Sequence, residues 1–175
     1  MLILLQLFCG WLYGHFFEYA AHRWLFHNKK LKSFFRYHYS QHHARARKGV
    51  MLDPLEKNVL EDFEAKALVF ILLLHLPLIF VLPYFYAMLV YSALMYLIIH
   101  RLTHRDDEFA RKLYPWHYDH HMGTDQNSNW GVRSQMFDKL LGTRVVYAGT
   151  KKEIIKYRNY KVFGKYALRS RSNKR

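Results

Sequence analysis

Ten of the twelve histidines in this 175-residue chain fall into four short clusters. Imidazole is a common metal ligand, and the ring binds a metal only in its neutral form. Crowded rings beside Lys and Arg would resist protonation, and a bound cation would stabilise them. The clusters therefore predict a metal site, with ligands at His22, His27, His38, His42, His43, His100, His104, His117, His120 and His121.

The spacing within the clusters predicts which rings share an ion. Residues at i, i+3 and i+4 lie on one face of an α-helix. His22 and His27 are five residues apart, so we expect an unwound turn or a helix end between them. In the other clusters the expected partners are His38 with His42, His100 with His104, and His117 with His120 and His121.

The residues around the histidines narrow the kind of metal site. A single His-x3-His pair is more often coincidence than a ligand set, but four clusters together favour metal binding. A zinc protease places Glu after the first histidine of such a pair, whereas Tyr39, Arg101 and Tyr118 stand there. Structural zinc commonly uses cysteines, and Cys9 is the single cysteine. Imidazole ligation suits iron, copper or zinc, so the ligands alone leave the metal open.

Two uncharged stretches, residues 1–17 and 67–99, indicate the elements that position these clusters. A bilayer core needs roughly 20 helical residues, so the second stretch fits a hairpin of two spans that borrow flanking residues. We predict spans at about residues 1–21, 65–82 and 84–102, with the hairpin tip at Leu82-Pro83-Tyr84. One long helix kinked at Pro77 is the alternative. A signal peptide is the alternative for the first span, but it lacks a basic beginning.

The charge pattern predicts the orientation. Residues 28–64 carry eight Lys or Arg, and the tail after Gly149 carries ten. By the positive-inside rule both segments are cytoplasmic and the amino terminus is outside. All four histidine clusters then lie on the cytoplasmic side. The net charge of +14 is interpreted as attraction to anionic lipid and not to nucleic acid, because a nucleic-acid binder has no use for such long uncharged stretches.

The clusters HRWLFH, HYSQHH, HRLTH and HYDHH resemble the histidine boxes of the fatty acid hydroxylase/sterol desaturase superfamily of membrane di-iron enzymes. Residues 127–143, NSNWGVRSQMFDKLLGT, are similar to two further elements of that family. The similarity covers roughly residues 18–143. One departure is the second box, where many members have one residue fewer before the histidine pair. Four-span members also have more membrane-embedded sequence, so a second copy could complete the wall of a lipid tunnel.

The resemblance implies an all-α membrane protein with the di-metal centre under a cytosolic helical cap. Together with the spans predicted above, this gives a helical bundle of about three spans. The ten box histidines match the family's ligand positions, with no catalytic residue beyond them. The implied cofactors are two Fe ions, with Zn in an isolated or inactive form, and O2 is the co-substrate. The implied reaction is hydroxylation or desaturation of a lipid C–H bond. A separate reductase, ferredoxin or cytochrome would supply electrons.

Several expectations remain beside this one. The chain divides into a membrane domain at 1–149 and a basic amphipathic or disordered tail at 150–175. A non-catalytic membrane protein that stores or senses metal, and a basic membrane-surface scaffold, are the rival functions. Glu18, Asp119 and Asn129 are candidates for supporting the ligands from outside, and His15 shares that role with Glu18. His75 is expected to form a helix–helix hydrogen bond and not to bind metal.

Overall fold

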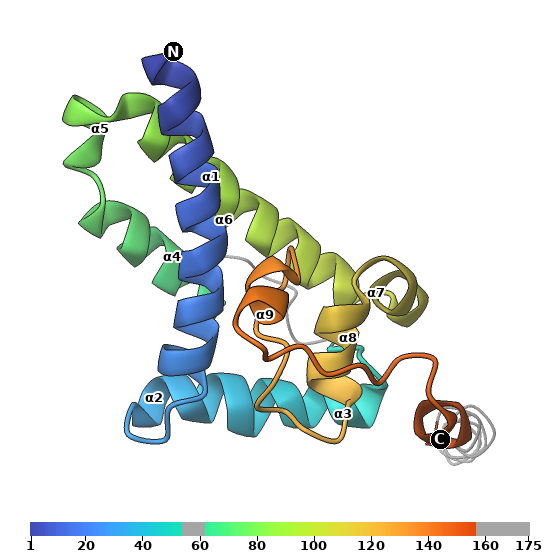
Figure 1. Ribbon diagram of the computed structural model, residues 1–175. Coiled ribbons are helices and arrows are strands. Elements are labelled where there is room, and N and C mark those ends of the chain that lie inside the picture. The colour runs from blue at the N-terminus through green and yellow to red at the C-terminus, as the bar shows by residue number, and fades with distance from the viewer. Residues whose placement is uncertain (54–61, 157–175) are drawn as a thin grey trace.

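The computed structural model describes residues 1–53 and 62–156, and the described part is helical without strands. This confirms the all-α prediction. Figure 1 shows the arrangement of the helices. Their bounds are α1 Leu2–Ala21, π-helix η1 His22–Phe26, α2 Lys32–Phe35, π-helix η2 Arg36–His43, α3 Ala44–Gly49, α4 Phe63–Leu74, α5 Leu78–Val81, α6 Pro83–Thr103, α7 Asp107–Leu113, α8 Pro115–Met122 and α9 Met136–Leu140.

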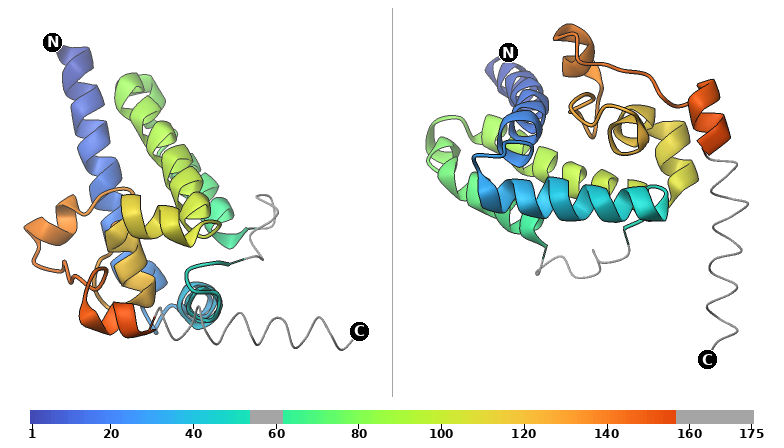
Figure 2. Two further views of the ribbon diagram at one scale, coloured as in Figure 1. Left: turned by 90° about the vertical axis from the view of Figure 1, so that its right-hand side faces the viewer. Right: turned by 90° about the horizontal axis from the view of Figure 1, so that it is seen from below.

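Helices α1 and α6 lie side by side and run in the same direction (Figures 1 and 2). At their beginnings the Tyr84 N–H donates to the Gln6 side chain at 3.2 Å. Two glycines one turn apart on α1 allow the close approach, because a Cβ on Gly10 would lie 2.8 Å from the Met88 Cβ, and one on Gly14 would lie 2.8 Å from the Ser92 Cβ. Small residues at such spacing let helix backbones meet in an apolar setting.

The predicted span at 65–82 is wrong as one continuous helix. Helix α4 ends at Leu74, and the chain turns through His75 and Pro77 before the short α5. Proline lacks an N–H and disfavours helical geometry in the residue before it, so the helix breaks here. At about 18 Å, α4 is too short for a hydrocarbon core of about 30 Å.

The predicted break at Leu82-Pro83 is confirmed, because Leu82 leaves helical geometry and Pro83 opens α6. The alternative of one helix kinked at Pro77 is therefore also wrong. Among the described residues, α6 is the one helix with the length and apolar composition of a membrane span. The three-span bundle is thus not confirmed.

The consecutive helices α2, η2 and α3 form one helical run that crosses beneath the ends of α1 and α6, seen end-on and lengthwise in the two views of Figure 2. Helices α7 and α8 pack beside it on a small core that includes Met51, Ala110 and Tyr118. An ion pair between Arg111 and Glu153 holds the beginning of the 150–175 segment to α7. The rest of that predicted tail, from residue 157, lies outside the described residues, and the boundary at 149 stays a prediction.

Candidate metal centre

The ten predicted ligands meet at the ends of α1 and α6, enclosed by η2 and α8. Nine of the rings are buried, with at most 2% of each exposed, and His27 is partly buried. Ring nitrogens within 4.8 Å of one another define two groups that could each hold a metal ion. We call them group A (His22, His27, His38, His43 and His120) and group B (His42, His100, His104 and His121).

His117 adjoins group B, because its Nε2 lies 3.2 Å from the Nε2 of His104. The predicted pairing of His100 with His104 is confirmed, since both belong to group B. Adjacent residues of α8 are about 100° apart around the helix, so they cannot face the same point. His120 accordingly belongs to group A and His121 to group B, which corrects the expectation that the last cluster serves one ion.

The first two clusters lie on π-helices, which explains their spacing. In η1 the His27 N–H donates to the His22 carbonyl, the i+5 bond of a π-helix, at 3.3 Å. Residues five apart then share a face. The expected interruption between the two rings is confirmed, because α1 ends at Ala21 and η1 ends at Phe26, just before His27. In η2 the same geometry brings the Nε2 of His43 to 3.2 Å from the Nε2 of His38. His42 turns instead to group B, which corrects its predicted pairing with His38.

Oxygen acceptors fix the outer nitrogens of several rings. The Nδ1–H groups of His22, His104 and His120 donate to the backbone carbonyls of Trp130, Met51 and Ser128, at 2.6, 2.7 and 2.7 Å. Carboxylates take the same role for two more rings, Glu64 for His38 at 2.7 Å and Asp53 for His42 at 2.9 Å. Such contacts set the tautomer, so each Nε2 presents a lone pair to the interior.

The inner nitrogens fit a cation. The Nε2 atoms of His22 and His38 lie 2.8 Å apart, yet both rings already use their Nδ1–H on oxygen. No proton is left between them, and two facing lone pairs repel unless a positive charge joins them. Several other buried ring nitrogens have no hydrogen-bond partner among the described residues, each at a typical cost of about 1–3 kcal/mol. These are both nitrogens of His121, Nδ1 of His43 and His117, and Nε2 of His100.

Burial also keeps three of the rings in their ligating form. Burial, with the nearby His38, lowers the pKa of His22 to about 3. Burial likewise lowers the pKa of His104 and of His120 well below the ordinary value, and neighbouring histidines add to it. His22, His104 and His120 are therefore neutral at physiological pH, as metal ligation requires.

Glu64 and Asp53 are supporting residues that the sequence reasoning missed. Both carboxylates are buried, with 2% and 3% of the residue exposed. Glu64 also lies 3.3 Å from the Nδ1 of His100 and accepts from the Tyr96 hydroxyl at 3.0 Å, so it touches both groups. The sequence position of Glu64 could have indicated its role, because Glu64 is the last acidic residue before a long uncharged stretch.

Glu18 and Asn129 support the site through a loop. Glu18 accepts hydrogen bonds from the backbone N–H groups of Val132 and Arg133 and forms an ion pair with the Arg133 guanidinium. These bonds fix the loop that also contains Trp130, whose carbonyl accepts from His22. Asn129 has a φ of +59° and lies between the two carbonyls, of residues 128 and 130, that hold His120 and His22. This left-handed backbone geometry directs the carbonyls of Ser128 and Trp130 toward His120 and His22.

Asp138, on α9, holds the same loop from the other side of the chain segment. Asp138 accepts from the N–H groups of Trp130 and Gly131 at 2.7 and 2.8 Å and from the Thr143 hydroxyl at 2.7 Å. Asp119 binds the Ala148 N–H and the Arg144 guanidinium, so its bonds hold the segment that follows this loop. The segment 127–143, noted for its similarity to the family, therefore holds in place the backbone carbonyls that orient the predicted ligands His22 and His120.

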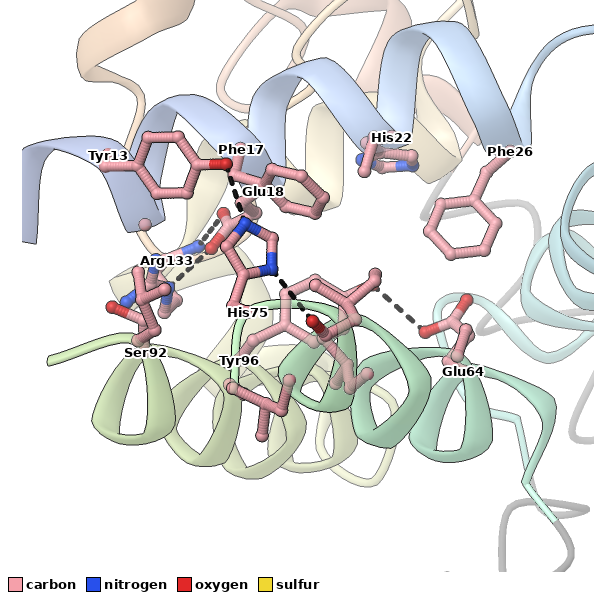
Figure 3. Close-up of a pocket in the computed structure, with 18 residues that line it drawn as sticks. Tyr13, Phe17, Glu18, His22, Phe26, Glu64, His75, Ser92, Tyr96 and Arg133 are labelled. Atoms are coloured by element: carbon pink, nitrogen blue, oxygen red, sulfur yellow. Dashed lines mark hydrogen bonds and ion pairs between the residues drawn. The ribbon is translucent and has the colours of Figure 1, made fainter. Parts of the chain in front are cut away.

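An apolar cavity lies between α1, α4 and α6, next to group A (Figure 3). His22, Glu64 and Tyr96 line one part of it, and its other walls are mainly apolar side chains such as Phe17, Leu68 and Leu72. Its empty space, open mouth included, is about 690 Å³. The Tyr13 hydroxyl bridges to the Nε2 of His75 at 3.0 Å across it, so His75 forms the expected helix–helix bond. His15 contacts Trp11 on its own helix.

The fold and site define a class of helical protein with two adjoining groups of histidines, each able to hold a metal ion, beside an apolar cavity. The model of the fatty acid hydroxylase family matches residues 7–143, so the chain belongs to that family. This confirms the resemblance found in the sequence. Neither the curated proteins nor the solved structures compared with the chain gave a match.

Proposed function

We propose that this protein oxidises an unactivated C–H bond of a lipid with O2, by hydroxylation or desaturation. The proposal rests on one observation above all: His22 both belongs to group A and lines the apolar cavity. A lipid chain in that cavity would lie beside the ions without crossing water. Family membership supports lipid oxidation, and the two histidine groups support metal binding.

The ten histidines would hold two iron ions, group A one and group B with His117 the other. Bound there, iron would supply the O2 activation that the reaction needs. The chain's own part is positioning. Glu64, Asp53 and three backbone carbonyls orient the rings, and Phe17, Leu68 and Leu72 keep water from the reacting carbon.

We also propose the membrane arrangement that this function needs. Helix α6 would cross the bilayer and α1 would accompany it, with the amino terminus outside and the histidine site cytoplasmic. The basic segments would attract anionic lipid, and a second copy could complete the cavity wall on its open side. A separate electron donor would supply the reducing equivalents.

A cavity-filling variant tests the catalytic proposal against metal storage. Ala67 lines the cavity, whereas Val69 on the same helix is exposed on its outer side. We expect Ala67→Phe to retain its metal but to lose O2-dependent oxidation of membrane lipids, measured by mass spectrometry as a gain of oxygen or a loss of two hydrogens. Val69→Phe should behave like the unmodified protein. Metal binding without oxidation of any lipid by the unmodified protein would favour storage.

A further inference from the structure

A groove opens on the cap between the α2–η2–α3 run and residues 124–127, and His43 lies at its inner wall. The groove is lined by Lys29, Phe35, Tyr39, Ser40, His43, Ala44, Arg47, Thr124, Asp125, Gln126 and Asn127. It shares no lining residue with the cavity, which runs along α1, α4 and α6. The site therefore has two approaches, an apolar one along the long helices and a polar one through the cap.

Stacked rings lead from this groove to the histidines. The ring centroids of Phe35 and Tyr39 are 4.8 Å apart with planes 18° apart, and those of Tyr39 and His43 are 5.4 Å apart with planes 28° apart. Phe35 and Tyr39 are partly exposed, whereas His43 is 1% exposed. The stack thus joins the surface to a proposed ligand.

His43 belongs to group A and also contacts group B. Its centroid is 4.6 Å from that of His120 in group A and 4.2 Å from that of His121 in group B. An electron that reached His43 would be next to both ions.

The approach to the groove is strongly basic. Residues 19–52 contain no Asp or Glu, and four exposed cations lie just before and along the α2–η2 segment: Lys29, Lys30, Lys32 and Arg36. Of these, Lys29 lines the groove. Asp125 is the acidic side chain that lines it. The α2–η2–α3 run is far from the amino-terminal ends of α1 and α6 (Figure 1), so a water-soluble partner can reach it. Complementary charge would steer an acidic partner to this face.

Resting on the proposed function, we propose that this groove docks a small acidic redox protein, which delivers electrons through Tyr39 and His43. In each step the reduced donor loses one electron and one metal ion of the centre gains it, with no bond made or broken. Phe35 and Tyr39 form the contact between the donor and the site. Lys29 and Lys30 set the orientation of docking.

Replacing Tyr39 tests the route. The probe is a pre-reduced acidic ferredoxin, and the readout is the stopped-flow rate at which it reduces the iron-loaded protein. We expect Tyr39→Leu to slow this step by about tenfold, equivalent to about 1.4 kcal/mol in the barrier, and Tyr39→Phe to leave it nearly unchanged. Iron content and reduction by dithionite should be the same in all three proteins. Equal ferredoxin rates for Tyr39→Leu and Tyr39→Phe would overturn the route.

Charge reversal tests the docking without any metal. We expect the pair Lys29→Glu and Lys30→Glu to weaken ferredoxin binding to the metal-free protein by at least about tenfold at low salt, with less effect at high salt. Lys112→Glu, at an exposed lysine of α7, is the control and should bind normally. If the double variant still bound ferredoxin but no longer bound anionic phospholipid vesicles, Lys29 and Lys30 would be membrane contacts, and the proposal would be overturned. If the purified protein bound no iron, the proposed function would be refuted. The binding measurement would still show whether the groove docks ferredoxin, because it uses the metal-free protein.

Discussion

The Glu64 carboxylate accepts a hydrogen bond from the Nδ1 of His38 at 2.7 Å, and its second oxygen lies 3.3 Å from the Nδ1 of His100. His38 belongs to group A and His100 to group B. One buried carboxylate therefore orients a ring in each group. The two proposed metal sites share this support and should respond together when it is changed.

The variant Glu64→Gln should lower the metal affinity of both groups. A glutamine amide keeps the size of the side chain but is uncharged and offers one oxygen acceptor, so one ring loses its partner and the other keeps only a weaker one. Loss of such a supporting carboxylate typically costs about 10–100-fold in metal affinity. Metal titration of the variant checks this, with Glu108→Gln, an exposed residue of α7, as the control. Unchanged affinity in Glu64→Gln would refute the bridging role.

Single replacements in α8 should separate the two ions. His120 faces group A and His121 faces group B, although they are neighbours in sequence. We expect His120→Ala and His121→Ala each to retain about one of two ions, and the double variant to retain neither. Elemental analysis of the three purified proteins measures this. If both single variants lost both ions, the division into two groups would be contradicted.

The backbone at Asn129 should tolerate glycine but not valine. Its φ of +59° is accessible to Gly and Asn, whereas a β-branched residue there is strained by about 1–3 kcal/mol. Asn129→Val should therefore shift the Trp130 and Ser128 carbonyls and weaken metal binding at His22 and His120. Asn129→Gly removes the side-chain bonds to residue 145 but keeps the geometry, so it should retain more metal. Equal metal content in the two variants would contradict this account.

Packing between α1 and α6 should depend on Gly14. A larger side chain would meet Ser92, and overpacking of this kind costs about 1–3 kcal/mol. Gly14→Leu should lower the midpoint of thermal unfolding in detergent. Phe8→Leu, at an exposed position of the same helix, should not. Equal midpoints for the two variants would show that the helices do not approach closely at Gly14.

Acid should destabilise the metal-free protein. Burial, with the nearby His38, lowers the pKa of His22 from 6.5 to about 3, so between these values the unfolded chain binds a proton that the folded chain does not. The contribution of this ring to stability is complete above pH 6.5 and is lost as the pH falls toward 3. Unfolding midpoints measured from about pH 7.5 down to about pH 5 should fall, and less steeply in His22→Gln. A midpoint independent of pH would contradict the buried neutral ring.

The sequence predicted much of this site because histidine clusters carry chemistry that few other arrangements explain. All ten predicted ligands do come together, and His100 and His104 share a group because α6 is regular. The pairing of His38 failed because α-helical spacing was assumed where the chain forms a π-helix. Glu64 and Asp53 were missed because a lone carboxylate acquires its role only when the fold brings a histidine to it.

Membrane spans were harder to predict, because composition does not show where a helix breaks. Pro77 splits the uncharged stretch earlier than the hairpin model required, while the break before Pro83 was correctly placed. The contact of Gly10 and Gly14 with α6 likewise depends on which helices become neighbours.

The most direct test of the account is the metal content of the purified, iron-loaded chain, combined with X-ray absorption at the iron edge. The ten converging rings predict about two iron ions per chain, with nitrogen neighbours at about 2.0–2.2 Å as the main ligands. Far less than one iron per folded chain, or a first shell dominated by sulfur, would contradict it.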